Sequence, residues 1–261
     1  MEERNAQLKW LYGSIDYTSL NGTDSVSYIS KELQFIKAIY EKSGWHPAAF
    51  CTWPIYARLV KQLLESTPIK TAVVAGGFPG GQTHFSIKMN EIAQAVDEGA
   101  DEIDFVINRG RFLSGDSVYL EEEIFMAKEH AKQASLKVIL ETGELSSRDA
   151  IRRASVLAIK NGADFIKTST GKSAVSATPE AVLEMTQAIK SHFVRTAQKV
   201  GIKPSGGISD IQTALQYASI VEQNTAKEWL QPRYFRIGAS RLAKEILKEA
   251  GLSNEGSQSA Y

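Results

Sequence analysis

The sequence predicts an α/β protein, a single (β/α)8 (TIM) barrel with an extra helix at its N-terminus. Three observations lead to this prediction: short apolar runs alternate with amphipathic stretches along all 261 residues, eight such runs can be counted, and no low-complexity linker divides the chain. Alternation favours parallel strands, and eight of them close a barrel of about 250 residues. An open doubly wound sheet is the alternative, which the lack of a G-x-G-x-x-G motif after the first run weakens.

Eight strands are predicted from the short apolar runs. Their ranges are Ser14–Tyr17, Ala48–Thr52, Thr71–Ala75, Glu102–Ile107, Lys137–Glu141, Phe165–Thr168, Gly201–Lys203 and Tyr234–Ile237. Residues 1–12 precede the first strand and are predicted to form a helix across the base of the barrel. We expect residues 1–252 to form the barrel domain and residues 253–261, SNEGSQSAY, to form a mobile tail.

The stretches between the predicted strands repeat apolar residues at helical spacing. In the first stretch, Asp24 is predicted as the N-cap of a helix that ends at Gly44. Thr178 is predicted to cap a later helix, with Pro179 in its first position. The segment SRLAKEILKEAG supplies the last predicted helix.

The composition indicates a cytoplasmic protein that binds neither nucleic acid nor membranes. Lysine plus arginine and aspartate plus glutamate both number 30, so no excess of positive charge favours nucleic acid or anionic lipid. Cys51 is the single cysteine, which excludes an intrachain disulfide and fits a reducing cytosol. The charged N-terminus predicts no signal peptide, and no apolar run approaches the roughly 20 residues of a membrane span.

Polar residues stand at the C-terminal ends of the predicted strands, where the catalytic groups of a barrel meet. These residues are Asp16 and Thr18, Cys51, Asp104 and Asn108, Glu141, Lys167, Lys203, and Gly238 to Ser240. Lys167 directly follows the apolar pair Phe165-Ile166, and a lysine is rarely buried without a partner or a function. The strand ends therefore predict an active site.

Two of these residues, Lys167 and Lys203, follow consecutive strands, so their side chains are predicted to meet. A neighbouring cation and desolvation both disfavour an ammonium, and the pKa of a lysine can then fall from about 10.4 towards roughly 7–8. The free amine attacks a carbonyl carbon, and Asp104 can move protons through a water. The alternative is structural: either lysine extends to solvent or pairs with a carboxylate.

Three glycine-rich segments after late strands predict a phosphate site. They are TSTGK (168–172), KPSGG (203–207) and GAS (238–240). Small residues expose backbone N–H groups, helix N-termini add positive potential, and barrels often bind phosphate after strands seven and eight. Each segment alone is equally consistent with a tight turn, so the prediction depends on their joint position.

The remaining candidates favour structural roles. Cys51 is predicted to pack inside the barrel, because no histidine lies in its local motif. The four histidines show no ligand spacing, so no metal is predicted. Glu141 is either catalytic or a brace for a lysine, and we favour the brace.

In combination, the motifs resemble 2-deoxyribose-5-phosphate aldolase, a family of class I (Schiff-base) aldolases. The matching segments are IDYTSL (15–20), GFPGG (77–81), GADEIDFVINRG (99–110), VILETGEL (138–145), GADFIKTSTGK (162–172), GIKPSGGI (201–208) and RIGAS (236–240). They extend over almost the whole chain in the same order and spacing. The resemblance implies reversible cleavage of 2-deoxyribose 5-phosphate to glyceraldehyde 3-phosphate and acetaldehyde, without a metal or organic cofactor, by a homodimer.

The resemblance also implies a role for individual residues. Lys167 matches the Schiff-base lysine, Lys203 the second lysine that keeps it deprotonated, and Asp104 the acid/base aspartate that works with a water. The residues implied to contact the phosphosugar are Asp16, Thr18, Cys51, Thr170, Gly171, Lys172, Gly206, Gly207, Gly238, Ser240 and Tyr261. Tyr261 matches a terminal tyrosine that reaches the site from the tail. Arg241 departs from the pattern, since some members carry a small hydroxyl residue there, and it either contacts phosphate or points to solvent.

Two other functions are compatible with parts of this pattern. One is another Schiff-base barrel enzyme, such as a transaldolase or a keto-acid aldolase, although those enzymes place the lysine differently. The other is a catalytically inactive relative that acts as a binding or scaffold protein. The presence of Lys167, Lys203 and Asp104 together weighs against an inactive relative.

Overall fold

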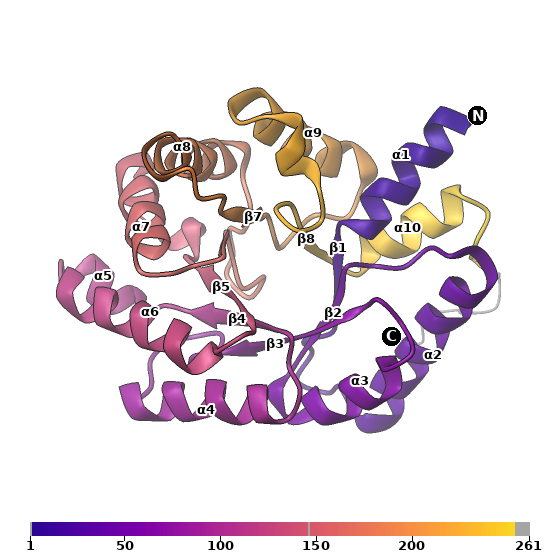
Figure 1. The fold of residues 1–261 in the computed structure, drawn as a ribbon, viewed down its shortest axis with the longest axis horizontal. Coiled ribbons are helices and arrows are strands. Elements are labelled where there is room, and N and C mark those ends of the chain that lie inside the picture. Colours follow the sequence, from indigo (N-terminus) through magenta and orange to yellow (C-terminus); the bar gives the residue numbers. More distant parts are fainter. Residues whose placement is uncertain (1, 146, 254–261) are drawn as a thin grey trace.

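Eight parallel strands lie at the centre of the molecule and helices surround them (Figure 1). The computed structural model describes residues 2–145 and 147–253. The strands are β1 (Ile15–Thr18), β2 (Ala49–Thr52), β3 (Lys70–Ala75), β4 (Glu102–Val106), β5 (Ser135–Ile139), β6 (Phe165–Lys167), β7 (Gly201–Lys203) and β8 (Ile237–Ala239). The predicted (β/α)8 barrel is confirmed.

Neighbouring strands pair in sequence order, and β1 pairs with β8. The barrel closes between β7 and β8 through isolated parallel bridges, Ile202 with Phe235 and Ser205 with Gly238. The last strand was predicted over Tyr234–Ile237 but lies over Ile237–Ala239. The backbone N–H groups of Tyr234 and Phe235 donate to the carbonyl of Gln231, so a turn replaces the ladder there.

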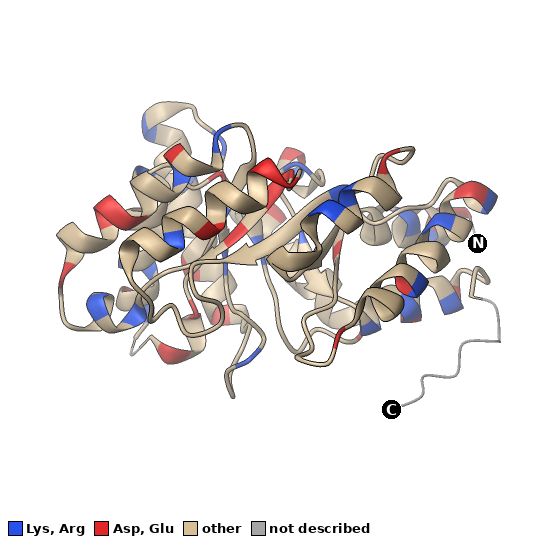
Figure 2. Ribbon diagram, turned by 90° about the horizontal axis from the view of Figure 1, so that it is seen from below, with Lys and Arg blue, Asp and Glu red and all other residues tan. Residues whose placement is uncertain are grey.

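Ten α-helices and three short 3-10 helices are described. The α-helices are α1 (Glu2–Gly13), α2 (Val26–Ser43), α3 (Ala57–Leu64), α4 (Phe85–Asp97), α5 (Arg109–Leu113), α6 (Ser117–Ala131), α7 (Arg148–Lys160), α8 (Pro179–Thr196), α9 (Ile211–Asn224) and α10 (Arg241–Glu249), and the 3-10 helices are η1 (Pro54–Tyr56), η2 (Thr142–Glu144) and η3 (Lys227–Leu230). Lysine and arginine residues are interspersed with aspartate and glutamate over these helices (Figure 2). None of the helices in the described ranges is long and apolar enough to cross a membrane.

The helix termini follow the predicted capping residues with one exception. The side chain of Thr178 caps α8, Pro179 occupies its first turn, and Gly44 ends α2 with φ 70°. The N-cap of α2 is Ser25, whose hydroxyl accepts from the N–H of Tyr28. Asp24 was predicted in that role, but its carboxylate accepts from Ser19, Asn21 and the N–H of Asn21 in the preceding loop.

Helix α1 packs beside α10 (Figure 1). Arg4 forms an ion pair with Glu249 of α10. Further along α1, Trp10 stacks on Phe235 and donates to the carbonyl of Leu230. The predicted N-terminal helix is confirmed, and its second half, with Leu8, Leu11 and Tyr12 buried, packs at the base of the barrel.

Strand side chains alternate between two environments, as the twofold period of a strand requires. On β4, Ile103 and Phe105 belong to the apolar core between strands and helices, while Glu102 and Asp104 point into the barrel. A second, smaller apolar cluster inside the barrel contains Leu20, Ala49, Cys51, Ala72 and Val74. The wall of the barrel is thus apolar on its outer side, while its interior also holds charged side chains.

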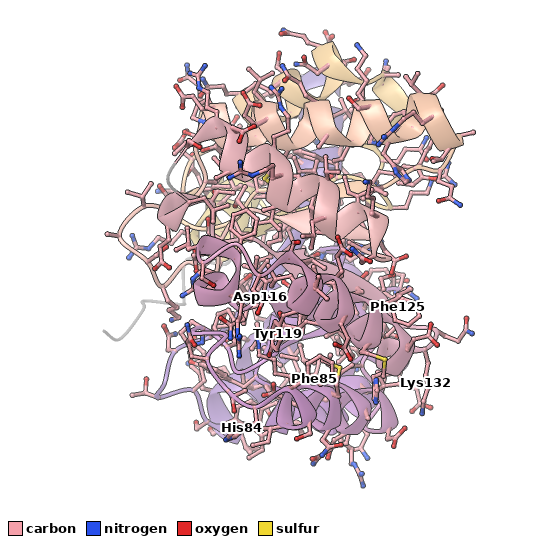
Figure 3. All side chains as sticks on the ribbon, turned by 90° about the vertical axis from the view of Figure 1, so that its left-hand side faces the viewer. His84, Phe85, Asp116, Tyr119, Phe125 and Lys132 are labelled. Atoms are coloured by element: carbon pink, nitrogen blue, oxygen red, sulfur yellow. The ribbon has the colours of Figure 1, made fainter. Side chains whose placement is uncertain are left out.

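Helices α4 and α6 are joined by a fully buried ion pair. The Lys88 ammonium lies 2.8 Å from a Glu123 carboxylate oxygen, and both side chains are 0% exposed. The other Glu123 oxygen accepts from the N–H of Asn108, which follows β4. On the outer side, Phe85 of α4 packs edge-on against Tyr119 of α6 (Figure 3). The Lys88–Glu123 ion pair, through the hydrogen bond from Asn108, therefore holds the loop after β4 against α4 and α6.

Replacing Lys88 with methionine should lower the free energy of unfolding by about 3–5 kcal/mol, because Glu123 would remain buried without its cation. Urea denaturation of both proteins measures this difference. Lys132→Met is the matched control, since its ion pair with Asp97 is exposed and should contribute less than about 1 kcal/mol. Equal losses in the two variants would contradict a buried charged pair.

Candidate active site

A cavity of about 320 Å³ lies at the C-terminal ends of the strands. It is lined by Lys167 and by eight of the residues implied to contact the phosphosugar, namely Thr18, Thr170, Gly171, Lys172, Gly206, Gly207, Gly238 and Ser240. The lining also includes five residues that were not among the predicted substrate contacts: Leu20, Asn21, Ser205, Ile208 and Ser209. The three glycine-rich segments therefore meet at one place.

Glycine allows two of these loops to approach closely. Gly206 has φ +85°, and a Cβ there would lie 2.4 Å from the Ser176 hydroxyl and 3.1 Å from the Cα of Gly171. Gly238 leaves similarly little room, since a Cβ would lie 2.4 Å from the Ser205 hydroxyl. Any larger residue at these two positions would displace the cavity wall.

The cavity has the charge expected of an anion site. Lys172 and Arg241 line it, and no aspartate or glutamate of the described residues does. Helix α10 begins beside it, and the Ser240 side chain makes no capping hydrogen bond. The first N–H groups of a helix have no intrahelical partner and carry positive potential. Arg241 lines the cavity and is also exposed, so a phosphate contact and a side chain directed to solvent both stay predictions.

Seven buried charged side chains lie beneath this cavity, inside the barrel, and we name them the barrel-core cluster. Its members are Asp16, Glu102, Asp104, Lys137, Lys167, Lys203 and Arg236, all at most 6% exposed. They come from β1, β4, β5, β6 and β7 and from the residue before β8. Parallel strands bring these seven positions, far apart in the sequence, to one axis.

Asp104 is the centre of the cluster. Its Oδ2 lies 2.7 Å from the Lys167 Nζ and 2.6 Å from the Lys203 Nζ, and its Oδ1 lies 3.1 Å from the Lys137 Nζ. Because Lys167 and Lys203 contact the same oxygen, their nitrogens lie within the roughly 6 Å over which neighbouring charges shift a pKa. The predicted meeting of the two lysines is confirmed.

The other cations of the cluster have more carboxylate partners than Lys167. Lys203 also contacts Asp16, at 2.5 Å. Lys137 contacts three carboxylates, with Asp16 at 2.9 Å in addition to Asp104 and Glu102. Among the described residues, Lys167 contacts Asp104 alone.

These contacts determine which cation of the cluster is least stabilised in its protonated form. The cluster holds three carboxylates and four basic side chains, so it carries one uncompensated positive charge when every group is ionised. Burying such a charge is costly, and in proteins the group shifts its pKa and neutralises instead. Lys167 has the fewest carboxylate partners, so it is the amine that is neutralised most easily.

The directions of the pKa shifts also indicate that Lys167 is the amine neutralised most easily. Burial lowers the pKa of the Lys167 amine, and the Lys203 ammonium lowers it further against the opposing effect of Asp104. Burial disfavours the Lys203 ammonium as well, but Asp104 and Asp16 hold its pKa above the usual value. The sequence suggested Lys203 as the main cause of a neutral Lys167, whereas burial is the larger one.

Asp16 and Cys51 were predicted to touch substrate, but both side chains are fully buried and lie below the cavity lining. The Asp16 carboxylate is occupied by Lys137, Lys203 and Arg236. The Cys51 thiol lies 3.8 Å from an Asp104 oxygen, and burial, followed by that carboxylate, raises its pKa to about 11. The thiol is therefore protonated at neutral pH.

Glu141 does not brace a lysine, contrary to the expectation. Its carboxylate accepts from the N–H and hydroxyl of Thr170 and from the hydroxyl of Ser173. The cation nearest to it in the described part of the chain is Arg109, at 4.0 Å. Glu141 therefore holds the loop after β6, which carries Gly171 and Lys172, in place.

Sequence reasoning missed Lys137, Glu102 and Arg236 as members of the cluster. Each has a signal that could have revealed it, because a charged residue stands inside or beside an apolar run: LKVIL for Lys137 and FRIG for Arg236. Glu102 shares a strand face with Asp104, two residues away. Tyr261 and residues 254–260 of the predicted tail lie outside the described residues. No group of His, Cys, Asp or Glu within residues 2–145 and 147–253 is arranged to hold a metal ion.

Comparisons with known proteins show which family this chain resembles. A sequence model described as DeoC/LacD family aldolase matches residues 12–244. The deoxyribose-phosphate aldolase of Homo sapiens is 38% identical over 270 residues, which cover 98% of this chain and 85% of that protein. A protein of the same name from Agrobacterium fabrum is 43% identical over 202 residues, which cover 77% of this chain and 76% of that protein.

Solved structures give the same fold. A protein described as "QR15, an Aldolase" matches with a TM-score of 0.76 at 28% identity, covering 94% of this chain and 99% of that one. A deoxyribose phosphate aldolase from Aeropyrum pernix, described as a unique tetramer, matches with a TM-score of 0.73 at 24% identity, covering 95% and 97%.

The fold and the site define a barrel enzyme of the aldolase class. Most of the chain is covered by the family match, and the resemblance found in the sequence motifs is thereby confirmed. The chain belongs to the DeoC/LacD family of aldolases. It is an enzyme, a carbon–carbon lyase.

Lys167 should react with a small aldehyde at a pH below the usual lysine pKa of about 10.4, because its lowered pKa provides the amine form earlier. Because only the neutral amine reacts, the reactivity of Lys167 rises as the pH rises through its pKa and stays constant above it. Borohydride reduction at each pH, followed by peptide mass spectrometry, measures this profile. Exposed lysines in the same digest are the internal comparison, and a Lys167 that reacts only in parallel with them would contradict the prediction.

Proposed function

We propose that this enzyme reversibly cleaves 2-deoxy-D-ribose 5-phosphate to D-glyceraldehyde 3-phosphate and acetaldehyde through a Schiff base on Lys167. One observation carries the proposal: Lys167 is the basic residue of the barrel-core cluster with a single carboxylate contact, and it also lines the cavity. The names of the human and Agrobacterium relatives support the choice of substrate. Lys203 and Asp104 complete the proposed catalytic set.

The reaction begins with the neutral Lys167 amine, which attacks C1 of the open-chain sugar. The carbinolamine loses water and becomes an iminium, so a positive charge returns to the nitrogen. Asp104 lies 2.7 Å from that nitrogen, and its carboxylate stabilises the new cation. Lys203 keeps its proton throughout, because two carboxylates contact it.

Cleavage uses the iminium as an electron sink. A water held by Asp104 takes the proton of the C3 hydroxyl, the C2–C3 bond breaks as C3 becomes a carbonyl carbon, and the electron pair of that bond moves into the enamine on Lys167. Glyceraldehyde 3-phosphate leaves. Protonation of the enamine carbon and hydrolysis of the resulting iminium release acetaldehyde and restore the amine.

The phosphate of the substrate is proposed to occupy the part of the cavity between the glycine-rich loops. Lys172 supplies a cation there, and the first N–H groups of α10 supply further donors. Thr18, Thr170, Gly171, Gly206, Gly207, Gly238 and Ser240 complete the proposed substrate-contact set along this lining. Asp16 acts on the substrate only as a member of the cluster, and Cys51 only through its contact with Asp104. A substrate contact from Tyr261 is also proposed.

The assembly and the cellular location are also part of the proposal. We infer a homodimer in the cytoplasm, on the basis of the family resemblance and the single cysteine. A small phosphosugar is the partner proposed for the cavity.

Lys167→Met should abolish turnover with little change in the free energy of unfolding, because the variant replaces an amine that is already neutral. Lys203→Met should also abolish turnover, but it should destabilise the protein by about 3–5 kcal/mol, since two buried carboxylates lose their ammonium. Release of acetaldehyde from the phosphosugar and urea denaturation measure the two effects. Turnover retained by Lys167→Met would refute the Schiff-base assignment, and no release by the parent enzyme would point to another aldolase donor or an inactive relative.

Lys172→Met should lower kcat/KM for 2-deoxyribose 5-phosphate by roughly ten- to a hundredfold, the range for a lost charge-assisted hydrogen bond. The same variant should act on unphosphorylated 2-deoxyribose as well as the parent enzyme does. Steady-state kinetics with both sugars test this prediction. Equal losses with both sugars would place Lys172 away from the phosphate.

A further inference from the structure

Arg236 belongs to the barrel-core cluster but lies at the opposite end of the barrel from the proposed reaction. It lines a cavity of about 360 Å³ beside the N-terminal ends of the strands, together with Trp10 and Trp45. Lys167 lines the cavity at the C-terminal ends. Arg236 therefore cannot contact a substrate bound there, and its burial needs another explanation.

The Arg236 guanidinium is fixed by four elements. Its NH1 lies 2.6 Å from Asp16 on β1, and its NH2 lies 2.8 Å from Glu102 on β4. Its guanidinium also lies 5.6 Å from the centre of the Phe165 ring on β6, and its Nε donates to the carbonyl of Pro232. Lys137 on β5 shares both carboxylates with it.

An unbroken series of contacts joins Arg236 to Lys167. One carboxylate oxygen of Asp16 contacts Arg236, and the other lies 2.5 Å from the Lys203 Nζ. Lys203 and Lys167 then share an oxygen of Asp104. Charge at the base of the barrel therefore acts on the amine at its mouth through groups that are all withdrawn from water, where screening is weak.

Counting charges gives the direction of this effect. With Lys167 neutral, three cations balance three carboxylates, and Arg236 is one of those cations. If the arginine charge were absent, the cluster would be balanced with Lys167 protonated instead. If the Glu102 charge were absent, the cluster would favour the neutral amine more strongly.

We propose that Arg236 and Glu102 are positioning residues that set the total charge of the barrel-core cluster and thereby keep Lys167 in its neutral, nucleophilic form. The other charged or titratable groups that face Lys167 are Asp104, Lys203 and Cys51, from β4, β7 and β2. These three residues act on Lys167 at close range. Arg236 and Glu102 set the total charge of the barrel-core cluster from the N-terminal end of the barrel. The inference rests on the proposed function, since it concerns the same lysine.

The test uses charge-removing variants of both residues in the full chain. The measured quantity is the pH at which borohydride trapping of a small aldehyde on Lys167 reaches half of its maximum. Arg236→Met should raise this pH by about one unit and Glu102→Gln should lower it by a similar amount, the size expected for one unit charge in the interior at an effective dielectric constant of about 20. The double variant should return close to the parent value.

A control variant, Arg233→Gln, separates the effect of the cluster charge from a general effect of charge at the basal cavity. Arg233→Gln removes an exposed charge that lines the same basal cavity, so it should leave the midpoint unchanged. Loss of stability alone would not shift the two single variants in opposite directions. Midpoints that stay constant or move in the same direction would overturn the inference, and if Arg236→Met does not fold, Glu102→Gln and the double variant still decide it. Absence of trapping on Lys167 in the parent enzyme would instead refute the proposed function.

Discussion

The balance between three buried carboxylates and four buried cations governs the chemistry of this barrel. A net charge in a low-dielectric interior is costly, so one basic group gives up its proton. Lys167 is that group because it contacts one carboxylate, whereas Lys203 contacts two and Lys137 contacts three. The lowered pKa of the Lys167 amine, which favours its nucleophilic form, thus follows from burial and from the way in which all seven side chains are paired.

The site consists of two layers that different parts of the fold supply. The strands carry the cluster on their inward-facing positions, and the loops after them form the cavity above it. Only Lys167 belongs to both layers, since it is a member of the cluster and also lines the cavity. The proton balance of Lys167 therefore depends on buried groups below the cavity, while the loops and the start of α10 form the cavity in which the substrate is proposed to bind.

The apolar wall of the barrel makes this arrangement possible. Outward-facing side chains such as Ile103 and Phe105 pack under the helices and fix the strands. Glu102 and Asp104, on the alternate positions of the same strand, then have little freedom to move away from their partners. Rigid strands hold charged groups in register more accurately than loops do, which a finely balanced cluster requires.

The amino-acid sequence by itself determined the barrel class, the ranges of most strands, the convergence of the two lysines with Asp104, and the glycine-rich loops that line the cavity. Alternating apolar runs and glycine-rich turns are local signals, and they can be read without three-dimensional information. The membership of Lys137, Glu102 and Arg236, the burial of Asp16, and the role of Glu141 as a loop anchor were decided only by the tertiary structure, whereas the packing of Cys51 inside the barrel was predicted from the sequence and is confirmed. Residues separated by as many as 220 positions, such as Asp16 and Arg236, become partners only when the barrel closes. Pairing between distant charges depends on strand register and burial, and neither is encoded in the residues next to them.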